Sequence, residues 1–117
     1  MDYRDDIKQC YSAIMQQESF AVQMHITMGV DIRPLAQTLD LLKIVMVYAW
    51  EHLGYGTYKD FFKGKELETK YLSLSNYSHS DKIGDFRKFL KQFRVRTLFD
   101  DDMASLAKME EIVEAIA

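Results

Sequence analysis

Residues Leu41–Trp50 read Leu-Leu-Lys-Ile-Val-Met-Val-Tyr-Ala-Trp, and nine of these ten residues are apolar or aromatic. Helix-breaking residues lie on both sides of this stretch, with Pro34 before it and Gly54 after it. Proline is tolerated in a first helical turn, and glycine accepts the left-handed conformation that ends a helix. A helix that is apolar nearly all round must be covered on nearly all sides. The sequence therefore predicts an all-α fold, a compact bundle of about five to six helices around a central apolar helix at residues 34–53.

The size and composition are those of an ordinary globular protein. A chain of 117 residues matches one domain, so we expect a single helical domain at 1–117. The single cysteine, Cys10, excludes an internal disulfide and fits a reducing compartment. The opening Met-Asp-Tyr-Arg-Asp-Asp is unlike a signal peptide, and the longest apolar run is broken by Lys43 and is too short to span a bilayer. We therefore expect a soluble, cytoplasmic protein with no membrane partner.

Apolar spacing predicts a first helix before the central one. Its inner face comprises Tyr3, Ile7, Cys10, Tyr11 and Ile14. Residues 19–30 are ambiguous, because apolar side chains from Val22 to Val30 alternate with polar ones as in a strand. The only candidate partner strands, residues 71–74 and 95–99, are weak. A helix ending at Gly29 is favoured, with minor β structure at 20–30 as the alternative.

Further helices are predicted after the central one. Thr57 is expected to cap a short helix that ends at Gly64, and another helix is expected from residue 65 to about residue 74. Residues 75–80 are predicted to form a polar loop, with Ser80 as the cap of the next helix. The expected buried residues of these last helices are Leu67, Tyr71 and Leu74, then Ile83, Phe86, Phe89, Leu90 and Phe93, and finally Met103, Leu106, Val113 and Ile116. The last helix is expected to begin at the acidic run of residues 100–102, where carboxylates complement the helix dipole.

Charge is strongly polarised near the C-terminus. Residues 82–96 hold six basic side chains and one acidic one, whereas residues 100–117 hold six acidic side chains and one lysine. Arg87, Lys88, Lys91 and Arg94 form one line on the predicted helix, the basic stripe. We predict that the basic stripe and Arg96 contact an acidic partner, if they are not paired with the acidic C-terminal helix. Nucleic acid is a less favoured partner, because the whole chain has a net charge of −3.

Six aromatic residues crowd into the fifteen positions from Tyr48 to Phe62, around a turn that contains two glycines. Such a cluster is usually part of a core. Loop tyrosines are also typical anchors at protein interfaces, because they contribute a large contact area at low entropic cost. Tyr55 and Tyr58 are therefore additional candidate binding residues.

No residue pattern points to catalysis, a metal or a cofactor. The three histidines, His25, His52 and His79, lie far apart and have no ligand spacing, so we expect one partly buried and two surface histidines. Cys10 falls on an apolar helix face, which favours an inert structural thiol. The run Ser78-His79-Ser80-Asp81 has the residue types of a triad, but sequence neighbours rarely face one another, so we interpret it as a turn and cap.

A small, mildly acidic helical domain without catalytic motifs favours a non-enzymatic protein-binding module. Such a module acts by covering the surface of another protein, as an inhibitor, an immunity or anti-defence protein, or an adaptor. The alternative is a nucleic-acid-associated regulator or a small subunit of a nucleoprotein complex that uses helix 82–96. An enzyme with a site assembled from distant residues and an oligomeric structural role are less favoured. The oligomeric state is left open.

Overall fold

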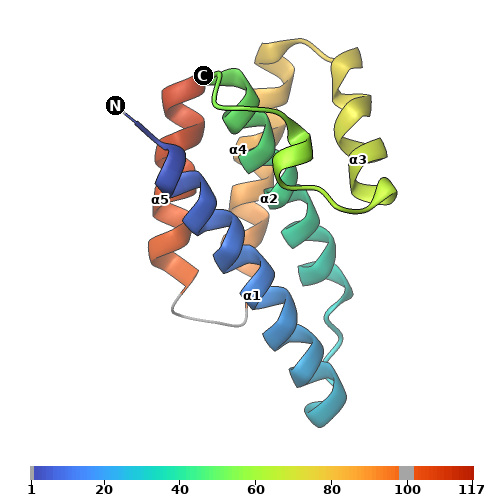
Figure 1. Ribbon diagram of the computed structural model, residues 1–117. Helices are drawn as coiled ribbons and strands as arrows, with labels where there is room; N and C mark the ends of the chain where they lie inside the picture. The colour runs from blue at the N-terminus through green and yellow to red at the C-terminus, as the bar shows by residue number, and fades with distance from the viewer. Residues whose placement is uncertain (1, 98–101) are drawn as a thin grey trace.

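The computed structural model describes residues 2–97 and 102–117, and these residues form an all-α fold. The α-helices are α1 (Arg4–Met28), α2 (Arg33–His52), α3 (Lys65–Leu72), α4 (His79–Arg96) and α5 (Asp102–Ile116). Two 3-10 helices, η1 (Tyr58–Asp60) and η2 (Ser73–Asn76), flank α3. Figure 1 shows α1, α2, α4 and α5 side by side, with α3 against the outer side of α2. The predicted bundle of about five helices is confirmed.

Helix α2 is the centre of the bundle, as its apolar run predicts. It packs against α1, α3, α4 and α5, and the side chains of Leu42, Val45 and Met46 are fully buried. Pro34 lies in its first turn, and Gly54 follows its end with a positive φ of 78°. The surrounding helices supply further large, fully buried side chains of the core, which are Ile7, Ile14, Phe86, Phe93, Leu106, Met109 and Ile112.

Helix α1 continues through residues 20–28, so the alternative of a strand at 20–30 was wrong. The helix ends at Gly29, which adopts the left-handed conformation with a φ of 69°. The N–H of Gly29 donates a hydrogen bond to the carbonyl oxygen of His25 at 3.0 Å. The alternating pattern misleads because most of this last part of α1 is exposed, so side-chain type there is not constrained by a core. In Figure 1 this part of α1 and the turn to α2 project beyond the other helices.

Three local predictions need correction. The cap of α4 is Ser78 and not Ser80: Ser78 is extended, and its Oγ accepts a hydrogen bond from the N–H of Asp81 at 3.1 Å. Helix α3 ends at Leu72 and continues as η2, which occupies the start of the predicted loop. Met103 is 37% exposed, because side chains in a first helical turn tilt back past the end of the helix. The prediction for residues 100 and 101 falls outside the described residues.

Thr57 caps η1, as predicted, although that helix has only three residues. Asp60 Oδ2 accepts hydrogen bonds from the N–H of Thr57 at 3.1 Å and from Trp50 Nε1 at 2.9 Å. Gly56 lies against this network: an added Cβ would collide with Asp60 Oδ2 and lie 2.6 Å from Trp50 Nε1. The turn therefore requires glycine at residue 56 for space, and it holds the following residues 61–64 close to α1 and α2.

Candidate functional site

The basic stripe lies on the outer side of α4, beside α5. Arg87 donates two hydrogen bonds to Glu114, from Nε at 2.8 Å and from Nη2 at 3.0 Å, and Arg94 Nη2 donates to Glu110 at 2.7 Å. The hydrogen bond from Arg87 lowers the pKa of Glu114, and the reciprocal contact raises the pKa of Arg87. Half of the basic stripe is therefore paired with the acidic C-terminal helix, although these side chains remain about half exposed.

The other members of the basic stripe keep their charge available to solvent. Lys88 and Lys91 are exposed, and within the described residues no carboxylate oxygen lies within 4.0 Å of either ammonium group. Lys91 lines a cleft of about 230 Å³ between α4 and α5, together with Arg87 and Arg94. Arg96 Nη1 donates to Thr38 Oγ1 at 3.1 Å, which ties the end of α4 to α2. The field of the basic stripe is thus weaker than its sequence predicts.

Tyr55 and Tyr58 are half-buried and brace the fold. The hydroxyl of Tyr55 accepts a hydrogen bond from the N–H of Tyr3 at 3.0 Å. The hydroxyl of Tyr58 donates to Glu68 at 3.2 Å, and its N–H donates to Glu51 at 2.7 Å. Desolvation is the main cause of the raised pKa of Tyr58. These contacts tie residues 55–58 to the start of α1, to α2 and to α3. Their role as binding residues stays a prediction.

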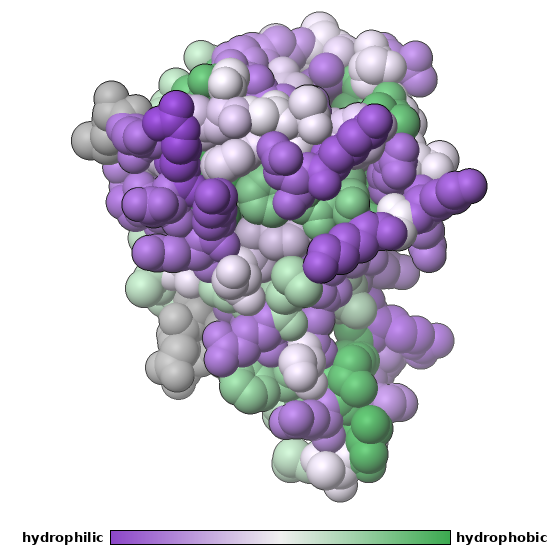
Figure 2. Space-filling model, viewed as in Figure 1, coloured by the Kyte–Doolittle hydropathy of each residue, from purple (hydrophilic) through white to green (hydrophobic). Residues whose placement is uncertain are grey.

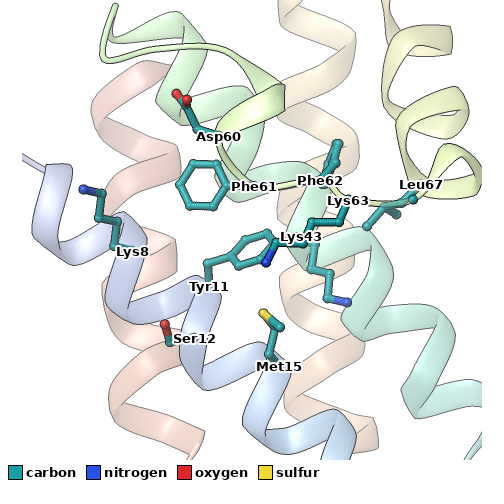
Figure 3. A pocket seen from close by; sticks show the side chains of 11 residues that line it. Lys8, Tyr11, Ser12, Met15, Lys43, Asp60, Phe61, Phe62, Lys63 and Leu67 are labelled. Atoms are coloured by element: carbon teal, nitrogen blue, oxygen red, sulfur yellow. The ribbon is translucent and has the colours of Figure 1, made fainter.

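A groove opens between α1 and α3, and we refer to it as the α1–α3 groove. Its volume is about 540 Å³, within the range of small-molecule and cofactor sites. Figure 3 shows aromatic and aliphatic side chains from α1 and from the segment around Phe61 pointing toward one another across it. The residues that line it are Lys8, Tyr11, Ser12, Met15, Lys43, Asp60, Phe61, Phe62, Lys63, Gly64 and Leu67.

The charges around the α1–α3 groove are unevenly balanced. Lys43 is only 14% exposed and forms an ion pair with Glu18 at 2.5 Å, so its charge is compensated. Lys8 and Lys63 are exposed, and no carboxylate oxygen of residues 2–97 or 102–117 lies within 4.0 Å of either ammonium group. Asp60 also lines the groove; its Oδ2 accepts from Trp50 Nε1 and from the N–H of Thr57, and because both donors are neutral, Asp60 keeps its negative charge. Lys8 and Lys63 together outnumber this one acid, so the rim of the groove has a small net positive charge above an apolar floor.

Exposed apolar side chains continue from this groove along α1. Met15 lines the groove and is 54% exposed, while Val22 and Ile26 are 49% and 74% exposed. Residues seven and eleven positions apart return to nearly the same side of an α-helix, so these three residues form one line, the α1 patch. Figure 2 shows hydrophobic surface at the projecting end of the molecule. The spacing of these three residues can be read from the sequence, but it places them on one side only if residues 20–28 are helical.

The fold brings together two histidines that the sequence places far apart. The rings of His52 and His79 stack with their centroids 4.7 Å apart. His79 Nε2 lies 2.8 Å from the carbonyl oxygen of Ile116, so it donates there, and Nδ1 then accepts from the hydroxyl of Tyr48 at 2.6 Å. Both ring nitrogens of His79 are used in holding α2, α4 and α5 together, and the lone pair of Nδ1 accepts the hydrogen bond from Tyr48.

Cys10 is buried on the inner face of α1, with Sγ 4.0 Å from the carbonyl oxygen of Ser105 on α5. Desolvation, together with the charge of Asp6, raises the pKa of the Cys10 thiol to about 11. A thiol with this pKa is almost entirely protonated near neutral pH and is a weak nucleophile. Ser78, in the triad-like run, acts as a helix cap, as described above.

Within residues 2–97 and 102–117, no three side chains of the metal-ligating types cluster, and no helix has the length and hydropathy needed to cross a membrane. No protein-family model, curated protein or solved structure matches the chain.

Proposed function

We propose that this protein is a non-enzymatic protein-binding module that acts by covering a partner's surface. The observation that carries the proposal is the α1 patch together with the α1–α3 groove, where apolar surface lies exposed on a well-anchored helix. Single exposed apolar residues are common on proteins, but here three lie on one side of α1, with Glu18 and Ser19 between Met15 and Val22, and they lead out of an apolar groove. Apolar side chains grouped in this way favour a contact with another macromolecule. Inhibitors, immunity or anti-defence proteins and adaptors all work through such a surface.

The shape of this surface favours a protein over a small molecule. Met15 and Ile26 are eleven positions apart, so the α1 patch extends about 16 Å along the helix axis. A small ligand would fill the α1–α3 groove and leave Val22 and Ile26 exposed. A protein element lying along α1 would cover both features together. Because α1 packs against α2 and α5, its surface is pre-formed and little entropy is lost in ordering it on binding.

The experiment is capture of a partner from the native cell, followed by binding measurements with purified proteins. Val22→Glu with Ile26→Glu places two charges in the α1 patch. The matched control, Gln16→Glu with Gln23→Glu, adds the same charges to exposed positions on another side of α1. We expect the patch variant to lose the partner and the control to retain it. Equal binding by both variants would show that α1 is not the contact surface.

The second candidate function is binding to nucleic acid through helix 82–96. It is favoured by the exposed Lys88 and Lys91, which have no carboxylate within 4.0 Å in the described part of the chain. Salt-dependent retention on DNA or RNA that is lost in Lys88→Glu with Lys91→Glu would support it. Retention that is unaffected by this change, or none at low salt, would exclude the basic stripe as a nucleic-acid site.

A further inference from the structure

We infer that the α1–α3 groove binds an amphipathic helix of the partner that carries acidic residues near one end. This inference rests on the proposed function, and it specifies the chemistry of the element that is bound. It follows from the direction of the groove, from its apolar floor and from the charge on its rim.

The length of this surface and the spacing of its residues fit a bound helix. Lys8 and Met15 line the groove, and Val22 and Ile26 continue the same side of α1. From residue 8 to residue 26 this line is about 27 Å long, the length of a helix of about 18 residues. Helices that bind in grooves present apolar side chains at intervals of three, four and seven residues. The spacing of Met15, Val22 and Ile26 has the same period, so a second helix packed along α1 meets all three.

The floor of the groove provides the apolar contact. Tyr11 and Phe61 pack with their ring centroids 4.8 Å apart, and Phe61 also packs edge-on against Trp50. Phe62 is buried and packs against Tyr71, so this wall is held firmly. Such a rigid aromatic floor is suited to one or two large aliphatic side chains of a partner helix.

The rim determines the sign of the charge on the partner. Lys8 lies on the α1 side and Lys63 follows η1 on the opposite side, and both lie near one end of the α1 patch. Neither lysine has a carboxylate within 4.0 Å among the described residues, whereas Lys43 between them is neutralised by Glu18. Carboxylates of a bound helix at this end would give the two lysines counter-ions and would accelerate association.

The test uses two synthetic helical peptides of about 18 residues with leucines at the same positions. One peptide carries glutamates at one end, and the other carries lysines at the same positions. Binding is measured by fluorescence anisotropy and mapped by amide chemical shifts. We expect the acidic peptide to bind about tenfold more tightly than the basic one at low salt, with shifts at Met15, Phe61 and Val22. Equal affinity, or failure of the acidic peptide to bind at millimolar concentration, would overturn the inference.

Charge variants locate the contact. Lys8→Glu with Lys63→Glu should weaken the acidic peptide by about tenfold, whereas Lys88→Glu with Lys91→Glu has the same change in net charge and should leave affinity nearly unchanged. If the contact of Lys8 with the Trp50 ring proves necessary for folding, Lys8→Gln with Lys63→Gln provides a milder second pair. Weakening by the basic-stripe variant alone would place the acidic contact on α4 and overturn the inference.

Other occupants of the groove give different results. Tighter binding of a long-chain fatty acid than of the peptide, with shifts restricted to the groove, would identify a small amphiphile as the ligand and overturn the inference. Self-association in sedimentation experiments that is abolished by Val22→Glu would identify a second copy of this chain. If Val22→Glu with Ile26→Glu abolishes capture of the native partner while the Lys8 and Lys63 variants do not, the proposed function stands and the acidic helix is wrong.

Discussion

The α4–α5 face and the α1–α3 groove both carry basic side chains. Carboxylates pair two of the four basic-stripe residues, but of the three lysines that line the groove they pair Lys43 alone, within the described residues. Glu110 and Glu114 of α5 pair with Arg94 and Arg87 on α4. At the groove, Lys8 lies over the ring of Trp50, and neither Lys8 nor Lys63 has a carboxylate within 4.0 Å in the described residues. The denser group of basic residues is thus the one whose arginines pair with an acidic helix, while Lys88 and Lys91 stay exposed.

The largest expected effect is unfolding of the protein, which would abolish both the α4–α5 face and the α1–α3 groove. Val45 is fully buried in α2, and replacing it with Asp places an unpaired charge in the core shared by the surrounding helices. Such a charge costs several kcal/mol against a total stability of about 5–15 kcal/mol, so Val45→Asp should unfold the protein. Circular dichroism with chemical denaturation measures this. Gln37→Asp, at an exposed position of the same helix, is the control; a folded Val45→Asp protein would show that α2 is not the centre.

The next largest expected effect is slow alkylation of Cys10, which lies at the interface between α1 and α5. Burial raises the pKa of the Cys10 thiol to about 11, so the thiolate is roughly a hundredfold scarcer than in a free cysteine near neutral pH. Alkylation of the native protein should be slower than that of the unfolded protein by at least this factor. Because the raised pKa is a property of the folded state, the stability it reflects is present at neutral pH and declines as pH rises above about 9. Rapid native-state alkylation would show that α1 and α5 separate readily.

A smaller loss of stability is expected from a substitution in the turn at residues 56–60, which holds the wall of the α1–α3 groove. Gly56→Ala would bring a methyl group against Asp60 and Trp50, and overpacking of this kind costs about 1–3 kcal/mol. Gly64→Ala is the matched control, because a Cβ there meets nothing within 4 Å and Gly64 has no positive φ. Thermal melts should show a lower Tm for Gly56→Ala only. Similar melts for both variants would mean that the 56–60 turn adjusts, and that the groove wall is less firmly held than the α4–α5 face.

The smallest expected change in stability comes from breaking one ion pair on the α4–α5 face. Arg87→Glu would place a carboxylate against Glu114, whereas Lys88→Glu changes the charge equally at a side chain with no such neighbour. We expect a slight drop in Tm for Arg87→Glu, diminished by added salt, and none for Lys88→Glu. Because the Arg87 contact lowers the pKa of Glu114, its contribution is present above the ordinary carboxyl pKa and is lost as pH falls below it. Identical melts would show that the pairs on this face contribute nothing measurable.

Local chemistry was sufficient to predict much of the helical framework. The apolar run of α2, Pro34 at its start, and the glycines at 29 and 54 all act within one or two turns of the chain. Thr57 was also predicted as a cap, because its hydroxyl needs to reach only a neighbouring amide. The choice of Ser80 over Ser78 failed because both residues satisfy the same local preference, and only the observed backbone shows which one is extended.

The candidate site depended on contacts between distant parts of the chain. Arg87 and Glu114 are 27 residues apart, and Tyr11 and Phe61 are separated by an entire helix. The sequence around Tyr55 and Tyr58 does not show whether these side chains point toward the protein or toward solvent. Their hydrogen bonds with Tyr3 and Glu68 in the folded protein decide this. The stacked histidines were missed for the same reason, since His52 and His79 meet only after α2 and α4 pack together.

The sequence by itself determined that this protein is helical, where most of its helices end and which residues of α2 must be buried, because hydrophobic period and turn chemistry act over a few residues. Only the tertiary structure decided which charges remain unpaired and where apolar surface stays exposed. Those properties depend on which helices become neighbours. Pairing with α5 neutralised Arg87 and Arg94, while the absence of such a neighbour left Lys8, Lys63 and the α1 patch open to solvent within the described residues.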